Sequence, residues 1–299
     1  MKNKMRLGAA VLGGALTLSG TSFADEGLFG YVRLAEPLPQ GAMDFEQWFT
    51  VRSDKGEGHY TALDTKTEIE WGITDRFTTS VELYGLGINT SGLMIDAYLP
   101  KDASYVWKPA GLEVATKYNF LSPAKDWIGL SQYVAFSYFW EDVNSGQRKD
   151  VYSVEGLLLA QKYFMDGQLV LAGNLGVEAT SAARKPIDGL PPDFEWPTTP
   201  EMEIEVTASA GITYRFAENW FIGGEIFYQT EHETTVGQER WSLQAGPTLH
   251  YGAKKWWATL TWLPQIRGGG LMYPGQTDTD LHLIEKTKQE IRLRIGYNF

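Results

Sequence analysis

Apolar and polar residues alternate one by one over much of the chain, most regularly from Met202 to Phe216. In this stretch Met, Ile, Val, Ala, Tyr and Phe occupy the even positions, and Glu, Thr, Ser, Gly and Arg occupy the odd ones. Successive side chains of a β-strand point to opposite faces, so a period of two separates an apolar face from a polar face. The segment is therefore predicted to be a strand that lies between an apolar and a polar environment.

Segments of strand-like pattern recur from residue 43 to the end of the chain. They are 43–51, 63–73, 77–88, 111–120, 127–141, 151–164, 169–180, 202–216, 220–230, 241–251, 256–266 and 289–299. This gives about twelve strands of about ten residues or slightly more, the length with which a tilted strand crosses a bilayer.

The connections between these segments alternate between short and long. Tight turns lie around Asp75, Lys125, Asp166, Glu218 and Ala253, whereas 89–108, 181–200 and 268–286 are long and rich in Gly, Pro, Asp and Thr. Sorted loops and an even strand count are typical of a transmembrane antiparallel up-and-down β-barrel with short periplasmic turns and long extracellular loops. A soluble β-sandwich, the alternative all-β fold, would not be expected to sort its loops so regularly.

The last segment, residues 291–299, carries Arg292 and Arg294 on its polar face and ends on an aromatic residue. Burying an arginine in a dry core costs free energy, whereas a solvated lumen accommodates its charge. The segment resembles the closing strand of bacterial outer-membrane β-barrels. This resemblance implies that Tyr297 and Phe299 form the membrane-insertion signal that the barrel-assembly machinery reads.

The first 24 residues have the pattern of a secretory signal peptide. Lys2, Lys4 and Arg6 precede a short apolar run, and small residues at Ser22 and Ala24 place the cleavage between Ala24 and Asp25. The chain contains no cysteine, which excludes a lipoprotein anchor and disulfides. No later segment approaches the roughly eighteen consecutive apolar residues of a spanning helix. A barrel in the bacterial outer membrane is expected.

Residues 25–41 precede the first strand and include Phe29, Tyr31, Leu34 and two prolines. They are too apolar to extend into water without a partner, so a periplasmic segment that forms a small plug is expected. The predicted organisation is a signal peptide at 1–24, the plug segment at 25–41 and the barrel at 42–299.

Aromatic residues gather beside the tight turns, as interfacial girdles do. Strands 127–141 and 151–164 alternate poorly, because Tyr133 and Phe139 fall on the inward side and Leu157 to Leu159 fit neither phase. Either a bulge or a segment packed inside the barrel would explain this irregularity.

The polar face is predicted to line the lumen, and it carries many charged residues. The lumen-lining candidates are Asp44, Glu46, Arg52, Asp64, Lys66, Glu68, Glu70, Glu82, Glu113, Lys117, Glu203, Glu205, Arg215, Glu225, Arg267, Arg292 and Arg294. A barrel pairs its last strand with its first, which should bring Arg292 and Arg294 to Asp44 and Glu46. These charges could pair and stiffen the barrel, or their excess of carboxylates could favour cations in a pore. The two interpretations are compatible.

Other functional classes find less support. After loss of the three signal-peptide cations, 23 basic and 37 acidic residues leave a formal charge of −14, which disfavours binding to nucleic acid. No histidine falls on an outward strand position, as the triad of outer-membrane phospholipases would require. The acids around Asp278 and Asp280 are too generic for a metal site, and 268–270 reads as a flexible loop base. No enzyme activity and no cofactor are expected.

The whole mature chain resembles uncharacterised Gram-negative outer-membrane barrels of this size, including channel-like barrels associated with the degradation of aromatic compounds. The resemblance rests on architecture and on the terminal strand, and it implies passive transport without naming a solute. The expected function is a channel or passive uptake pore for small polar or cationic solutes. The alternative is a structural or surface-interaction barrel with a sealed lumen and binding loops. Outer-membrane lipid and lipopolysaccharide are the expected surroundings.

Overall fold

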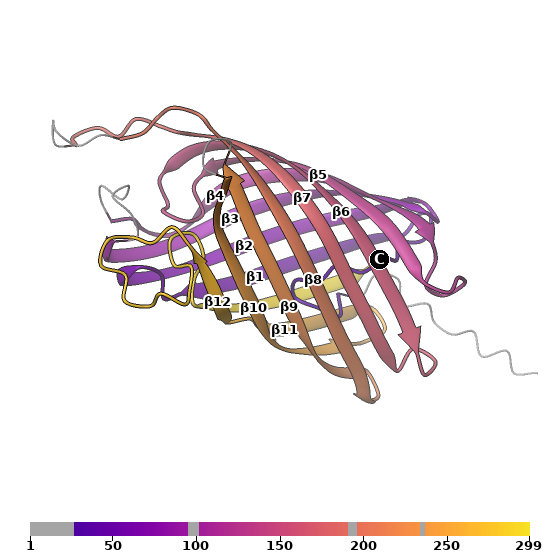
Figure 1. The fold of residues 1–299 in the computed structure, drawn as a ribbon. Helices are drawn as coiled ribbons and strands as arrows, with labels where there is room; N and C mark the ends of the chain where they lie inside the picture. Colours follow the sequence, from indigo (N-terminus) through magenta and orange to yellow (C-terminus); the bar gives the residue numbers. More distant parts are fainter. Residues whose placement is uncertain (1–26, 95–101, 191–195, 234–236) are drawn as a thin grey trace, which may run out of the picture.

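The computed structural model describes residues 27–94, 102–190, 196–233 and 237–299. The predicted signal peptide and its cleavage site at Ala24 and Asp25 lie outside the described residues. The described chain is an all-β, closed antiparallel barrel of twelve strand positions (Figure 1). No helix in the described part of the chain has the length and apolar character needed to span a bilayer.

Thirteen strands form the wall of the described barrel. Consecutive strands pair from β1 to β11, whereas, among the described residues, β12 pairs only with β10, and β13 pairs with β11 and β1. They are β1 (Met43–Ser53), β2 (Glu57–Thr74), β3 (Phe77–Met94), β4 (Ser104–Leu121), β5 (Gly129–Glu141), β6 (Arg148–Phe164), β7 (Leu169–Arg184), β8 (Glu201–Ala217), β9 (Trp220–Glu233), β10 (Gly237–Gly252), β11 (Trp256–Trp262), β12 (Gln265–Gly270) and β13 (Gln289–Asn298). β13 closes the ring on β1, with Asp44 opposite Asn298 and Ser53 opposite Gln289.

One wall strand is interrupted. β11 and β12 follow one another along the same edge of β10, and only β11 also pairs with β13. The break lies at Leu263 and Pro264, where the proline has no N–H to donate to the ladder. The prediction of one continuous strand over 256–266 was therefore wrong, and so was the assignment of Gly268–Gly270 to a loop, since these residues belong to β12.

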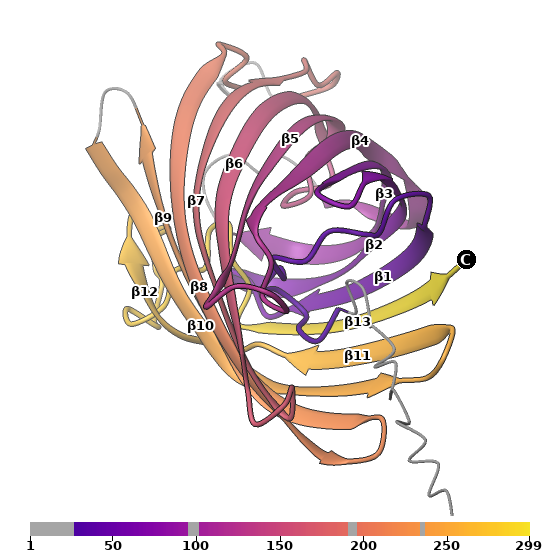
Figure 2. The ribbon, with the colours of Figure 1, turned by 90° about the vertical axis from the view of Figure 1, so that its right-hand side faces the viewer.

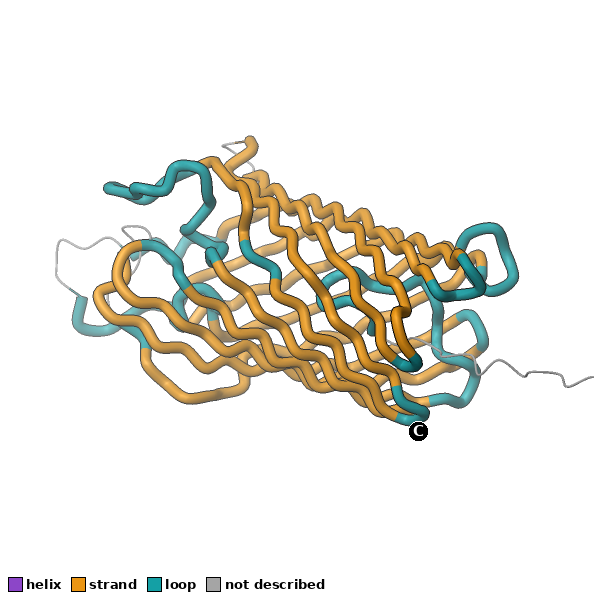
Figure 3. The backbone as a smooth tube through the Cα atoms, turned by 90° about the horizontal axis from the view of Figure 1, so that it is seen from below, coloured by secondary structure: helices purple, strands orange, loops and turns teal. Residues whose placement is uncertain are grey.

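The predicted sorting of connections is confirmed. Short turns join β2 to β3, β4 to β5, β6 to β7, β8 to β9 and β10 to β11 at one end of the barrel, and the C-terminus lies at this short-turn end (Figure 3). The other end is the long-loop end. There several strands continue further than expected, with β2, β3 and β4 each 18 residues long. The long connections are correspondingly shorter than the sequence pattern suggested.

The two faces of the wall differ as the alternation predicts. Apolar side chains such as Val81, Val114, Ile204 and Ile222 are exposed on the outer face. Aromatic residues beside the short turns are also exposed, among them Trp220, Trp256 and Phe299. Amphipathic rings favour the level of the lipid headgroups, so these residues form a belt at the short-turn end. The polar residues of the same strands point into the ring.

Residues 27–42, here called the N-terminal segment, run inside the ring near its short-turn end (Figure 2). Leu28, Phe29, Val32 and Leu34 are buried and pack with Val170 and Ala172 of β7. Apolar burial of this kind supplies roughly 1.5–3 kcal/mol for each large side chain. The segment therefore has the packing of a core element.

The irregular pattern of β5 and β6 has a local cause. Leu157 and Leu159 both point inward, where they pack with Tyr133 and with Ala35 of the N-terminal segment, while Leu158 is exposed outward. The pairing of β5 with β6 is continuous at these positions, so no bulge lies there. An apolar inward face is required because the segment packs against it.

Candidate functional site

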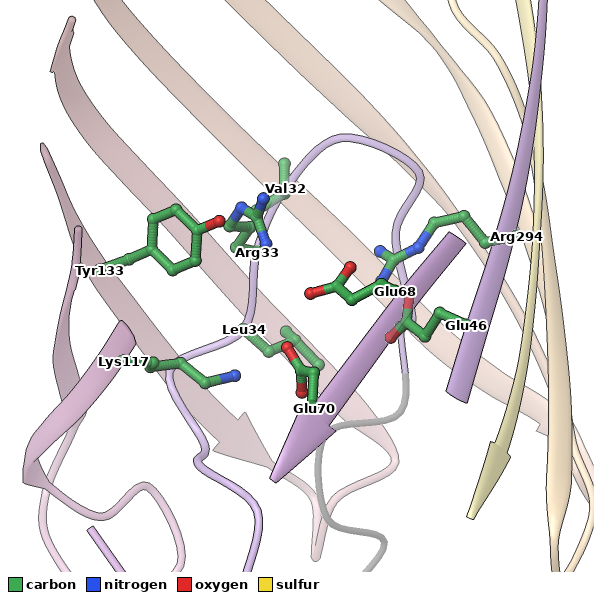
Figure 4. Close-up of a pocket in the computed structure, with 10 residues that line it drawn as sticks. Val32, Arg33, Leu34, Glu46, Glu68, Glu70, Lys117, Tyr133 and Arg294 are labelled. Carbon is green, nitrogen blue, oxygen red and sulfur yellow. Dashed lines mark hydrogen bonds and ion pairs between the residues drawn. The ribbon is translucent and has the colours of Figure 1, made fainter. Parts of the chain in front are cut away.

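The interior of the barrel contains two cavities that meet at the N-terminal segment. The larger has a volume of about 550 Å³ and lies between this segment and the loops of the long-loop end. The smaller has about 20 Å³ and is lined by residues of the segment together with Glu46, Glu68, Glu70 and Lys117 (Figure 4). Arg33 borders both cavities. The segment thus separates the larger cavity from the short-turn end.

One carboxylate on the wall accepts three hydrogen bonds from the backbone of the N-terminal segment. Glu225 of β9 accepts hydrogen bonds from the backbone N–H groups of Gly30, Tyr31 and Val32 at 2.7, 2.7 and 2.9 Å. Its side chain is buried, and Thr261 donates to the same carboxylate at 2.8 Å. Charge-assisted bonds are the stronger kind, and here they satisfy backbone donors that strand pairing does not reach.

Further wall residues on other strands complete the attachment of the segment. Arg294 donates to the carbonyl of Phe29 at 2.7 Å, and Arg292 donates to the carbonyl of Gly30 at 3.0 Å. Asn174 both donates to and accepts from the backbone of Arg33. Strands β7, β9 and β13 therefore all contribute to one short stretch of extended backbone.

Two rows of glutamates run across the inner wall, and in each row the residues lie directly opposite one another on neighbouring strands. The first carboxylate row, on β1 to β4, consists of Glu46, Glu68, Glu82 and Glu113. The second carboxylate row, on β6 to β9, consists of Glu155, Glu178, Glu205 and Glu231. Like charges that face each other across strands destabilise a sheet, so each row requires an explanation.

Nearby cations and hydroxyl groups partly compensate the charge of the first carboxylate row. Lys66 lies 2.6 Å from Glu68 and 2.7 Å from Glu82, and Arg294 lies 2.7 Å from Glu46. The Tyr133 hydroxyl donates to Glu113 at 2.9 Å. These buried charges are paired and hydrogen-bonded, which is what burial of a charge demands.

The second carboxylate row borders the larger cavity and has fewer partners. Glu231 pairs with Arg240 at 3.1 Å, and Gln229 donates a hydrogen bond to Glu205. Within the described chain, neither Glu155 nor Glu178 has a cationic nitrogen within 4.0 Å. Both rows thus consist of glutamates on neighbouring strands, but the groups that surround them differ.

The predicted lumen residues differ in where the structure places them. Asp44, Glu46, Arg52, Lys66, Glu68, Glu70, Glu82, Lys117, Glu225 and Arg294 are buried inside the ring. Arg52, Asp64, Lys66, Glu203, Glu205 and Arg292 border the larger cavity. Glu113 faces inward beside Tyr133, and Arg215 is exposed at the short-turn end.

One predicted position and one predicted pairing do not hold. Arg267 lies opposite Leu243 on the outer phase of the wall, because the register between β10 and β12 shifts at Gln244. Its side chain is 61% exposed and pairs with Asp280 at 3.0 Å. Arg292 pairs with neither Asp44 nor Glu46; it lies opposite Thr50 and donates to its hydroxyl at 2.8 Å. Arg294 does pair with Glu46, at 2.7 Å, as closure of the last strand on the first predicts.

The loop between β12 and β13 contributes residues that sequence patterns missed. Tyr273, Leu281, Leu283 and Ile284 form a buried apolar cluster, and Glu285 and Lys286 border the larger cavity. Burial lowers the pKa of His282 in this loop to about 3. The loop lies over the long-loop end of the barrel, although its sequence shows no strand or helix period.

Comparison with known proteins supports the fold. An outer membrane channel from Pseudomonas putida F1 is 12% identical with a TM-score of 0.56, and the match covers 89% of this chain and 98% of that one. The beta domain of the Bordetella autotransporter BrkA is 10% identical with a TM-score of 0.51, over 87% and 100% of the two chains. At these identities the likeness shows an outer-membrane barrel fold and nothing finer.

No curated protein matches the chain in sequence. One family model covers residues 21–299, which is nearly the whole chain and includes the N-terminal segment and every strand of the barrel. The chain belongs to the family of unknown function DUF6662.

Proposed function

We propose that the protein is an outer-membrane channel, or passive uptake pore, for small polar or cationic solutes. The observation that carries the proposal is the cavity of about 550 Å³ inside a closed ring whose outer face is apolar. Only helices and closed barrels satisfy all backbone groups in lipid, and a polar interior of this size is characteristic of barrels that pass solutes. Passive transport needs no catalytic residue, and none is assigned.

The charge of the cavity supports a preference for cations. Carboxylates raise the local concentration of cations and lower their energy in a pore. Ten carboxylates and six cationic groups border the cavity: Asp64, Glu141, Asp142, Glu155, Glu178, Glu203, Glu205, Glu231, Glu285 and Glu290 against Arg33, Arg52, Lys66, Lys149, Lys286 and Arg292.

The proposed orientation places the short turns and the C-terminus in the periplasm and the long loops at the cell surface. This is the usual arrangement of outer-membrane barrels. Epitope tags inserted at Asp188 or Gly275 should label intact cells, whereas tags at Asp166 or Glu218 should label only permeabilised cells. The reverse pattern of labelling would contradict the orientation.

A second candidate is a structural barrel whose lumen is sealed. It is favoured by the N-terminal segment, which packs into the short-turn half of the ring and is held there by Glu225. We infer that the segment acts as a plug: under the channel proposal it narrows or gates the pathway, and under the alternative it closes the lumen permanently.

Planar-bilayer recordings of the refolded protein in a potassium chloride gradient distinguish the two candidates. A channel should show discrete conductance with a reversal potential on the cation-selective side. Glu203→Gln, in the cavity wall, should reduce this selectivity, and Glu218→Gln, in an exposed turn, should leave it unchanged. Absence of conductance from well-folded protein would support the sealed barrel, and anion selectivity would contradict the proposed solute class.

A further inference from the structure

The larger cavity holds charges of both signs, and several of them have no ion-pair partner within 4.0 Å among the described residues. Glu155, Glu178, Glu203 and Glu205 border it from β6, β7 and β8, and in the described ranges none of the four lies within 4.0 Å of a cationic nitrogen. Charges removed from bulk water normally acquire partners. Four adjacent carboxylates without an ion pair are therefore not explained by the stability of the barrel.

Two guanidinium groups border the same cavity and also lack carboxylate partners among the described residues. The Arg33 guanidinium lies 4.1 Å from the centre of the Tyr133 ring, and that of Arg292 lies 3.8 Å from the centre of the Tyr31 ring. Stacking on an aromatic face positions a guanidinium without neutralising its charge. Both groups are thus held in place as positive charges at the floor of the cavity.

The topology places Arg292 far around the ring from these carboxylates. Arg292 is on β13, next to β1, and β7 lies six strand positions from β1 in the ring of twelve. Arg33 lies on the N-terminal segment, at the end of the cavity nearer the short turns. The carboxylates of β6 to β8 therefore face Arg292 across the cavity, whereas Arg33 lies toward the short-turn end of the cavity.

We propose that this cavity is a binding site for a small solute that carries a cationic group at one end and a carboxylate at the other. The cationic group would lie against the Glu178 and Glu205 side and the carboxylate toward Arg33 and Arg292. A volume of about 550 Å³ lies within the roughly 300–1,000 Å³ of small-molecule sites. Because carboxylates outnumber cations around the cavity, the class that fits is an α-amino acid with a basic side chain.

This inference deepens the proposed channel function by naming the class of solute, yet binding can be measured without conduction. Isothermal titration calorimetry of the full-length protein in detergent, with L-arginine as the probe, tests it. Agmatine, which keeps the guanidinium but lacks the carboxylate, serves as the matched probe.

The variants should affect the two probes differently. Arg33→Gln should weaken the binding of L-arginine by about tenfold and should not weaken that of agmatine, because only L-arginine has a carboxylate that loses a charged partner. The double variant Glu178→Gln and Glu205→Gln should weaken both probes by at least about tenfold. Glu218→Gln, in an exposed turn, should weaken neither.

Heat-modifiable gel mobility would verify that each variant forms the barrel. Absence of L-arginine binding to folded wild-type protein would overturn the inference, as would equal losses for both probes in Arg33→Gln. Since cation-selective conductance could persist in either case, a failure here is distinguishable from a failure of the proposed channel function.

Discussion

The two carboxylate rows on the inner wall are alike in sequence and different in environment. On β1 to β4, the glutamates are compensated by Lys66, Arg294 and tyrosine hydroxyls. On β6 to β9, Glu155 and Glu178 border an open cavity, and within the described chain neither has an ion pair. Alternation in the sequence places both rows inside the barrel. The role of each row depends on whether cations and hydroxyl groups from other parts of the chain lie beside it.

The comparison separates charges that hold the barrel together from charges that are available to a solute. Paired charges beside the N-terminal segment stabilise one half of the interior. Unpaired charges around the cavity cost stability and are therefore candidates for function. Substitutions in the two rows should consequently have opposite effects.

The largest effect is expected from Lys66→Met in the first row. This change leaves Glu68 and Glu82, both buried and directly opposite each other, without their shared cation. Loss of one partner from a buried charge group costs about 3–5 kcal/mol. Urea-induced unfolding from lipid vesicles would measure the loss, and Lys125→Met in an exposed turn provides the control. An unchanged unfolding free energy would show that the first row is solvated.

The next largest effect tests which residues of β8 face lipid and which face the lumen. The inward position of both carboxylate rows depends on the same alternation. Val206 is exposed on the outer face of β8, and Thr207 borders the cavity. Arginine on the lipid face at mid-membrane costs roughly 2–4 kcal/mol, whereas a lumen position tolerates it. Val206→Arg should therefore impair insertion into vesicles and Thr207→Arg should not. Equal insertion of both variants would contradict the assignment of the faces.

The smallest effect has the opposite sign. Glu178 lies directly opposite both Glu155 and Glu205, so Glu178→Gln removes two repulsive neighbours from the second row. Relief of cross-strand repulsion is worth about 0.2–1 kcal/mol for each pair. The variant should unfold at a slightly higher urea concentration than the wild type. A decrease in stability would mean that Glu178 has a structural partner, and the contrast between the rows would not hold.

The sequence was sufficient for most of the wall and insufficient for what lies inside it. β8 alternates over its whole length, so its faces followed from the pattern alone. Arg267 was misplaced because the register shift beside Gln244 depends on a proline break that moves the following residues to the other phase. The inward position of Glu225 could be predicted, but its partners could not, since they are backbone N–H groups that carry no sequence signal.

The same limit applies to β5 and β6. Their apolar inward residues Leu157 and Leu159 indicated that something packs there, and the sequence left a bulge and an internal segment as equal explanations. Only the three-dimensional contacts with Ala35 distinguish them, because they join residues more than a hundred positions apart in the chain.

We propose a cation-preferring channel whose short-turn end is narrowed or gated by the N-terminal segment. Single-channel conductance of full-length protein and of a variant lacking residues 27–41 tests it most directly. Glu225→Ala, which keeps the chain complete but removes the acceptor of three backbone N–H groups, is the companion variant. The account predicts larger, cation-selective conductance after the deletion and more frequent opening in Glu225→Ala. Conductance that is unchanged in both folded variants would contradict it.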